Sequence, residues 1–206
     1  GGSVPTIERG APSIVLRIER ELMFFDCGEG TQRQVAFAKL RYGRLSRVFI
    51  THLHGDHVLG LGGLLQTLSL SGRERPVQIF GPPGIRKFID ALEDALRFMP
   101  TFRIAISEIA DLNRIFENSQ YTVRACRADH DNSPSFAFLF EERWRPGKFS
   151  PDLARKLGIP EGPLWKKLQF GESVKLKNGS IVDSDMVVGP KRAGRRIVYS
   201  GDTRPT

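Results

Sequence analysis

Thr51-His52-Leu53-His54-Gly55-Asp56-His57 is the stretch that decides how this chain folds and what it holds. It follows the apolar run 47–50, which predicts a strand, and it precedes a helical pattern. The chain has four histidines in 206 residues, and the only one outside this stretch is His130. Neutral imidazole nitrogen and carboxylate oxygen suit Zn²⁺, with Mn²⁺ or Fe²⁺ as alternatives. The stretch therefore predicts a metal site.

The spacing within this stretch favours two ions over one. His52 and His54 are two residues apart, so they point to the same side of an extended segment. Asp56 and His57 follow where the strand passes into a loop and the next helix begins, and they can face a neighbouring point. Two metals about 3.5–4 Å apart are a recurring device for phosphoester hydrolysis. The alternative is a histidine-rich surface loop, but the position between a strand and a helix favours a site.

Length and composition are those of one ordinary domain with a core. Hydrophobic residues make up 40% of the chain and charged residues 26%, as in soluble globular proteins. No apolar run approaches the roughly 20 residues that span a bilayer, and the N-terminus has no secretory pattern. We therefore expect a cytoplasmic protein without a membrane partner. Cys27 and Cys126 lie in apolar, strand-like segments, so we expect two buried thiols rather than a disulfide.

The net charge of +8 is unevenly distributed and predicts either an anionic partner or a basic surface. Residues 141–192 carry 11 basic and 7 acidic side chains, which is half of the excess. Residues 58–140 balance at 9 of each sign.

Short apolar runs alternate with a few helical patterns, which indicates an α/β chain with layered sheets. The predicted helices are 31–40, 58–70 and 82–98. The predicted strands are 13–19, 22–27, 47–51, 77–80, 102–109, 121–128, 135–140 and 196–200.

Residues 141–192 differ from the rest, because they are rich in turns and have few core-like apolar stretches. We predict one short helix over 150–158, with Ser150 as its N-cap, and a hairpin at Asn178-Gly179. Between them lies the aromatic and basic run 164–168. The segment is interpreted as an excursion from the main body, and the alternative is an ordinary surface insertion.

A centre with two metals needs further ligands. His130 follows the predicted strand 121–128, and Asp202 follows the predicted strand 196–200, so both lie at C-terminal strand ends like the first four candidates. An aspartate between two metals can bridge them. Gly201 allows close approach of the backbone at that point.

Taken together, these residues resemble the metallo-β-lactamase superfamily, and more closely its ribonuclease Z (tRNase Z) family of tRNA 3′-processing endoribonucleases. The HxHxDH pattern is typical of the superfamily. The resemblance to ribonuclease Z rests on the stretches 1–6, 25–34, 51–57, 60–65, 81–84 and 199–205, and it covers essentially the whole chain.

The resemblance implies a metallo-β-lactamase αββα sandwich formed by residues 1–206 as a single domain, with residues 141–192 inserted as a protruding tRNA-binding arm. The family's first strand is expected to be truncated. Its last metal-binding histidine, and a downstream Glu/His region that would protonate the leaving group, are expected after Thr206. We therefore expect this chain to be part of a longer enzyme.

The resemblance also implies roles for single residues. One Zn²⁺ would bind His52, His54 and His130, the other would bind Asp56 and His57, and Asp202 would bridge them. Asp56 is also the candidate to orient or deprotonate the attacking water. The predicted contacts to precursor tRNA are Arg9 in the N-terminal loop and, in the arm, Gly162, Pro163, Lys166 and Lys167. The family further implies a homodimer, with hydrolysis that leaves a 3′-hydroxyl on the tRNA.

Two other functions stay open on the sequence. One is a hydrolase of the same fold that acts on a small phosphodiester, thioester or lactone and does not need the basic arm. The other is a catalytically silent subunit that binds RNA or a protein partner. The complete set of histidines and aspartates argues against the second, because buried polar groups without a partner cost stability.

Overall fold

A computed structural model describes residues 4–110, 114–131 and 133–204. The ends of the family-like stretches 1–6 and 199–205 therefore lie partly outside the described residues. The chain divides into two compact units. Unit 1 comprises Gly1–Phe116, Val123–Leu139 and Val198–Thr206, and unit 2 comprises Glu117–Thr122 and Phe140–Ile197.

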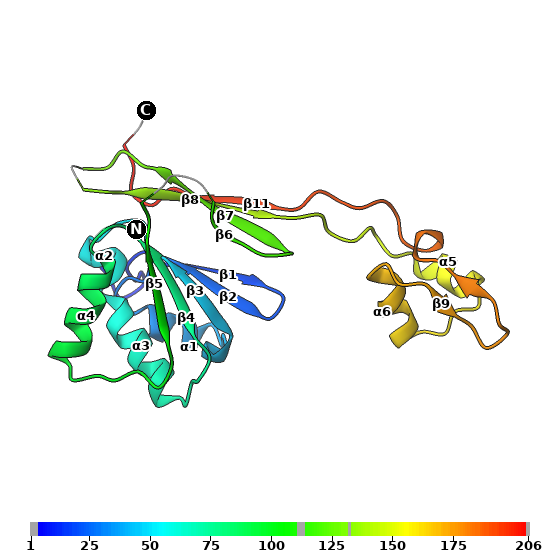
Figure 1. Cartoon of the computed structure of the whole chain (residues 1–206), viewed down its shortest axis with the longest axis horizontal. Coiled ribbons are helices and arrows are strands. Elements are labelled where there is room, and N and C mark those ends of the chain that lie inside the picture. The colour runs from blue at the N-terminus through cyan, green and yellow to red at the C-terminus, as the bar shows by residue number, and fades with distance from the viewer. Residues whose placement is uncertain (1–3, 111–113, 132, 205–206) are drawn as a thin grey trace. The chain divides into compact units, whose positions relative to one another are not determined.

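Unit 1 contains a five-stranded sheet with the strand order β1-β2-β3-β4-β5 (Figure 1). The first two strands form an antiparallel hairpin, and the later neighbours pair in parallel. Parallel strands all end at the same edge of a sheet, so the loops after β2 and β3 lie close together. The strands are β1 (Ile14–Ile18), β2 (Glu21–Phe25), β3 (Leu45–Phe49), β4 (Val77–Gly81) and β5 (Ile104–Glu108).

Strand β2 is buried on both faces, and its side chains alternate between two cores. Leu22 and Phe24 join the core that the helices cover, whereas Phe25 stacks against aromatic rings on the other face. A strand covered on both sides reads as a continuous apolar run, as Leu-Met-Phe-Phe does here. The covering helices are α1 (Thr31–Phe37), α3 (Gly60–Leu70) and α4 (Ile85–Ala95), and short helices at Gly55–Val58 (α2) and Tyr42–Arg44 (3₁₀) complete this part.

A second sheet, with the order β11-β8-β7-β6, covers the opposite face (Figure 1). The ring of Phe138 lies 6.0 Å from that of Phe25 and 5.6 Å from that of Phe49, and Tyr199 also packs on Phe25. Each fully buried aromatic side chain contributes about 1.5–3 kcal/mol. The strands are β6 (Arg114–Glu117), β7 (Tyr121–Arg127), β8 (Phe136–Glu142) and β11 (Arg196–Tyr199).

Unit 2 has a small core of its own, lined by the buried side chains of Ala154, Ile159, Leu168, Val174, Val182 and Val187. Its elements are α5 (Pro151–Lys156), α6 (Pro163–Gln169), the hairpin β9 (Val174–Lys175) and β10 (Ile181–Val182), and a 3₁₀ turn at Ser184–Met186. The chain enters and leaves this part side by side. Arg145 and Arg192 exchange two backbone hydrogen bonds of 2.9 and 3.0 Å.

Most predicted elements are confirmed, including the short helix capped by the Ser150 hydroxyl and the hairpin around Gly179. Strand β6 and helix α6 were not predicted. Residues 141–192 form a small core although they have few core-like apolar stretches, because their apolar residues are scattered singly and meet only in three dimensions. Cys27 is buried, but Cys126 is exposed, because it alternates with the inward-facing Ala125 on β7.

Within the described part of the chain, no helix has the length and apolar character needed to cross a membrane.

Two glycines allow the loop after β2 to contact the start of α3. A Cβ added to Gly60 would lie 2.0 Å from the carbonyl oxygen of Gly28, and a Cβ added to Gly28 would lie 2.1 Å from that of Asp56. The backbone amide of Gly60 donates to Cys27 across this contact at 2.9 Å. The residues that position the histidine-rich loop therefore depend on backbone-to-backbone packing.

Replacing Gly60 with Ala should lower the free energy of unfolding by about 1–3 kcal/mol, as overpacking does, although Ala favours a helix by about 1 kcal/mol. Gly43→Ala is the matched control, because nothing lies within 4 Å of an added Cβ there. Urea denaturation measures both. Equal stabilities for the two variants would contradict this role of backbone packing.

Candidate metal centre

The six predicted ligands follow the ends of strands, on loops or in the short helix α2. His52 and His54 follow β3, and His54 is the N-cap of α2. Helix α2 carries Asp56 and His57 in its first turn. The two others come from distant parts of the sequence, His130 after β7 and Asp202 after β11. The fold thus gathers at one edge residues that are up to 150 positions apart.

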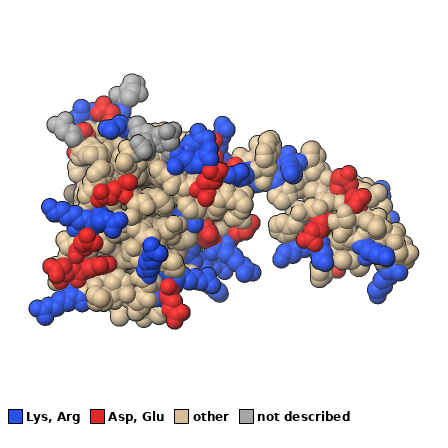
Figure 2. Space-filling view, in the orientation of Figure 1, with Lys and Arg blue, Asp and Glu red and all other residues tan. Residues whose placement is uncertain are grey.

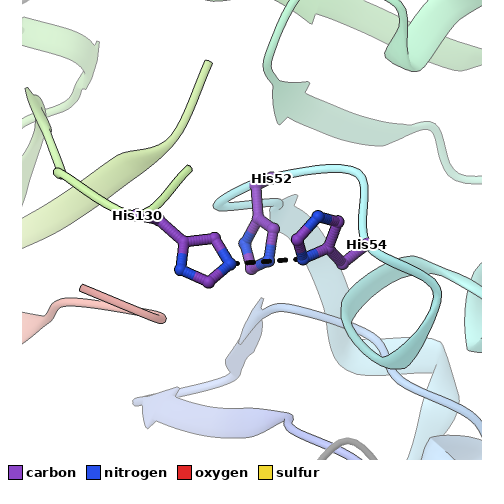
Figure 3. Close-up of side chains that lie close together, drawn as sticks. All are labelled: His52, His54 and His130. Carbon is purple, nitrogen blue, oxygen red and sulfur yellow. Dashed lines mark hydrogen bonds between the residues drawn. The ribbon is translucent and has the colours of Figure 1, made fainter. Parts of the chain in front are cut away.

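Two overlapping groups of side chains could each hold a metal ion, and Figure 3 shows the first of them. The first ligand group is His52, His54 and His130, and the second ligand group is His52, His57 and Asp202. Within each group, one ligand atom of every residue lies within 4.8 Å of the others. Asp56 borders the second group, with its Oδ2 3.5 Å from His57 Nε2, the same distance as Asp202 Oδ2.

A buried carboxylate that was not among the predicted site residues supports this arrangement. Asp26, at the end of β2, is fully buried and accepts hydrogen bonds from four donors. These are the Thr51 amide at 2.7 Å, the Thr51 hydroxyl at 2.9 Å, His57 Nδ1 at 2.6 Å and the Tyr199 hydroxyl at 2.8 Å. Asp26 has a φ of 59°, in the left-handed region that Asp tolerates better than most residues.

This network determines which imidazole nitrogens are free. An ionised Asp26 can only accept, so His57 Nδ1 carries the proton and donates it. The Thr51 hydroxyl donates to Asp26, so its oxygen accepts from His52 Nδ1, 2.9 Å away. In both rings the Nε2 atom is left with its lone pair.

Those two Nε2 atoms fit a metal ion. His52 Nε2 and His57 Nε2 are buried and have no hydrogen-bond partner among the described residues. Leaving such atoms unsatisfied costs about 1–3 kcal/mol each. A carboxylate or hydroxyl on the far nitrogen is also the usual support of a metal-binding histidine. The donors present, imidazole nitrogen and carboxylate oxygen, suit a divalent transition metal.

The charges of the site separate its histidines. Burial, together with His57 and His54 nearby, lowers the pKa of His52 to about 4, which keeps this imidazole neutral. Burial also works to lower the pKa of His57, but the hydrogen bond and charge of Asp26 outweigh it and raise the pKa. Burial and the neighbouring Asp26 raise the pKa of the Tyr199 phenol, so Tyr199 stays a donor.

Backbone contacts hold the two later loops against the first. The Arg204 amide donates to the carbonyl of Asp129 at 2.6 Å, which joins the loops that carry Asp202 and His130. Gly201 has a φ of 59°, and an added Cβ would lie 2.8 Å from the Thr51 side chain. The predicted close approach at Gly201 is confirmed.

The predicted RNA-binding residues lie elsewhere. Arg9 is exposed, and its backbone amide donates to the Thr6 hydroxyl at 3.1 Å. In unit 2, Gly162 is the N-cap of α6 with a φ of 124°, and Pro163 is its first residue. Lys166 and Lys167 are exposed in the last turn of the same helix.

Sequence reasoning missed Asp26, Tyr199 and Asp131, whose Oδ2 lies 2.9 Å from His54 Nε2. A charged residue at the end of an apolar strand was the available signal for Asp26. The signal for Asp131 was a second acidic residue beside His130. Neither pattern names its partner, because each partner is tens of residues away.

Comparisons with known proteins show which families this chain resembles. A family model described as "Anti-Pycsar protein Apyc1" matches residues 4–154. Ribonuclease Z of Nitrosopumilus maritimus is 43% identical over 202 residues, which are 98% of this chain and 67% of that protein. The chain spans 64–67% of the length of the curated ribonuclease Z relatives that it matches.

Two solved structures have a similar fold. The short form of human tRNase Z is 39% identical with a TM-score of 0.61, over 67% of this chain and 61% of that one. The metallo-β-lactamase fold protein YhfI from Bacillus subtilis is 16% identical with a TM-score of 0.53, over 75% of this chain and 63% of that one. The predicted metallo-β-lactamase fold is thereby confirmed. With these similarities, the chain belongs to the ribonuclease Z family, and its residues 4–154 also match the family described as Anti-Pycsar protein Apyc1.

Proposed function

We propose that this chain carries the metal centre of an endoribonuclease that removes the 3′ trailer from precursor tRNA. The reaction is hydrolysis of one phosphodiester, and it leaves a 3′-hydroxyl on the tRNA. One observation carries the proposal. Two buried imidazole nitrogens, His52 Nε2 and His57 Nε2, have no hydrogen-bond partner among the described residues. Their side chains belong to the two groups that could each hold a metal ion, and these groups share His52. Family membership supports RNA as the substrate.

The proposed cofactor is two Zn²⁺ ions, with Mn²⁺ or Fe²⁺ as alternatives. His52, His54 and His130 would hold one ion, Asp56 and His57 the other, and Asp202 would be shared. Bound ions would lower the pKa of the attacking water and stabilise the charge that builds on the phosphoryl oxygens.

The protein's own groups prepare and direct this reaction. Asp56 lies beside the second ligand group, and its side chain is 13% exposed, so it remains accessible to a water molecule. We assign it the role of orienting this water and accepting its proton. Asp26, through Thr51 and His57, keeps the lone pairs of two ligands directed inward.

Unit 2 is proposed to bind the tRNA body as the family's arm. Lys and Arg side chains are exposed on it (Figure 2), and these neutralise phosphates. Trp144 is 71% exposed and Phe170 is 63% exposed, and both border a cavity of about 760 Å³ together with Arg145 and Lys191. Exposed aromatic rings beside basic groups suit unstacked bases. By contrast, Trp165 packs on Phe149 within the unit.

The extent of the similarity favours this substrate over a small one. The ribonuclease Z relatives align with 98–100% of the chain, which includes unit 2, whereas the match to the Anti-Pycsar family ends at residue 154. A small phosphodiester would not need unit 2. A homodimer that acts on transcripts in the cytoplasm is part of the same proposal.

Replacing Asp202 with Ala should reduce cleavage of precursor tRNA by about 10²-fold or more, the scale of losing one group that stabilises transition-state charge. The reason is that Asp202 belongs to the second ligand group and, in the proposed assignment, is shared by both ions. Cleavage is followed by gel electrophoresis of a labelled precursor in the naturally expressed protein, with metal content determined in parallel.

Asp90→Ala serves as the control, because this aspartate is exposed on helix α4 of unit 1. Unchanged, chelator-sensitive cleavage by the Asp202 variant would refute the assignment. A wild-type protein that binds metal but cleaves no RNA would favour the catalytically silent subunit.

Excising residues 146–191 and joining Arg145 to Arg192 through Asn-Gly should abolish tight tRNA binding but retain turnover of bis(p-nitrophenyl) phosphate. Arg145 and Arg192 already form a hydrogen-bonded pair, which a two-residue turn can close. Steady-state kinetics on both substrates measures the effect. If precursor tRNA were cleaved with an unchanged KM, unit 2 would not be the RNA-binding element.

The double variant Lys166→Ala and Lys167→Ala should bind tRNA more weakly, and the slope of log Kd against log salt should fall by about 0.9 for each phosphate that is no longer neutralised. The control, Lys87→Ala with Arg103→Ala, removes the same charge from exposed positions in unit 1. Filter binding at several salt concentrations gives the slopes. Identical reductions in affinity for both pairs would show that only net charge matters.

A further inference from the structure

Each imidazole in a ligand group has one ring nitrogen that faces the proposed metal and a second, far nitrogen that faces away from it. The far nitrogens differ in their hydrogen-bond partners. The far nitrogens of His52 and His57 are held by the buried network of Asp26. His54 packs edge-on against the His52 ring, but it has no hydrogen bond to that network among the described residues. Its ring is 47% exposed, and its Nδ1 lies 3.2 Å from His130 Nε2, on the side of the first ligand group.

Asp131 holds the far nitrogen of His54. Its Oδ2 lies 2.9 Å from His54 Nε2. Its Oδ1 accepts from the amide of Ser133 at 2.7 Å and from the Ser133 hydroxyl. One carboxylate oxygen is thus bound within its own loop, which directs the other oxygen at the histidine. A carboxylate whose Oδ1 already accepts two hydrogen bonds offers its Oδ2 as an acceptor as well.

The direction of this hydrogen bond has a consequence for His54. Because Asp131 accepts, Nε2 carries the proton, and Nδ1 keeps its lone pair. That lone pair points to His130 and His52, the other members of the first ligand group (Figure 3). A carboxylate in this position also raises the basicity of a ligating imidazole.

Stability does not explain the contact. His54 and Asp131 are 47% and 37% exposed, and ion pairs at such exposure contribute little to folding. The pair does join two loops that each supply ligands, the loop after β3 and the loop after β7. We therefore expect its main effect to be on the orientation of the His54 ring, which is 47% exposed.

We infer that Asp131 is a positioning residue for the metal centre, which orients His54 and thereby strengthens binding of the ion held by His52, His54 and His130. The inference rests on the proposed function, since it requires that this group binds a metal. Asp131 would thus orient a ligand on the exposed side of the site, as Asp26 orients ligands on the buried side.

The test is the affinity for Zn²⁺ alone, measured by competition with a chromogenic chelator on the naturally expressed protein. Asp131→Ala should weaken binding of the ion about 10- to 100-fold, the usual cost of losing such a partner. Asp131→Asn should bind more tightly than Asp131→Ala, because its amide oxygen still accepts from His54 Nε2. The melting temperature of the metal-free protein should be the same for all three proteins.

Two controls separate positioning from other effects. Asp129→Asn removes the same charge on the other side of His130, and its affinity should equal that of the wild type. In a His54→Ala background, adding Asp131→Ala should have no further effect, because the residue through which it acts is gone.

Three outcomes would overturn the inference: wild-type affinity in both Asp131 variants, an equal weakening in Asp129→Asn, or an additive weakening in the double variant. Asp131→Asn preserves the shape of the side chain, so it decides the matter should Asp131→Ala not fold. A wild-type protein that binds no divalent metal would instead refute the proposed function.

Discussion

The buried carboxylate of Asp26 is the constraint on which the rest of the structure depends. An ionised carboxylate without partners is very costly in a protein interior. Its four hydrogen bonds offset that cost, and hydrogen bonds to charged groups contribute about 1.5–3 kcal/mol each. The donors come from Thr51 after β3, from His57 in α2 and from Tyr199 on β11. Both sheets must therefore be in place before Asp26 is satisfied.

This requirement links the fold to the chemistry. Folding that satisfies Asp26 also determines that Nδ1 is the protonated nitrogen of His52 and His57. The remaining Nε2 atoms keep their lone pairs and have no hydrogen-bond partner among the described residues. The cost of leaving those atoms without a partner would be removed if a metal ion bound them, which would add to the stability of the folded protein. The ligand groups are thus held by hydrogen bonds that do not depend on the ion.

The sequence pointed to the candidate ligands that the fold brings together, but not to the residues that support them. Spacing alone paired His52 with His54, because a strand places alternate residues on one side, and the ends of strands pointed to His130 and Asp202. The partners of Asp26 are up to 173 residues away, so no local pattern could assign them. The core of unit 2 escaped prediction for a similar reason. Its elements are two to seven residues long, too short for a hydrophobic period.

The network around Asp26 and the structure of unit 2 differ in how far the effect of a substitution extends. Asp26 ties distant segments of unit 1 together, so a change there reaches several ligands at once. Unit 2 has its own core, and the part of it between Arg145 and Arg192 begins and ends where these two residues bond to each other. A part built in this way can change in length and charge while the network around Asp26 stays intact. Insertions and changes of charge should therefore destabilise the protein less in unit 2 than substitutions around Asp26 would.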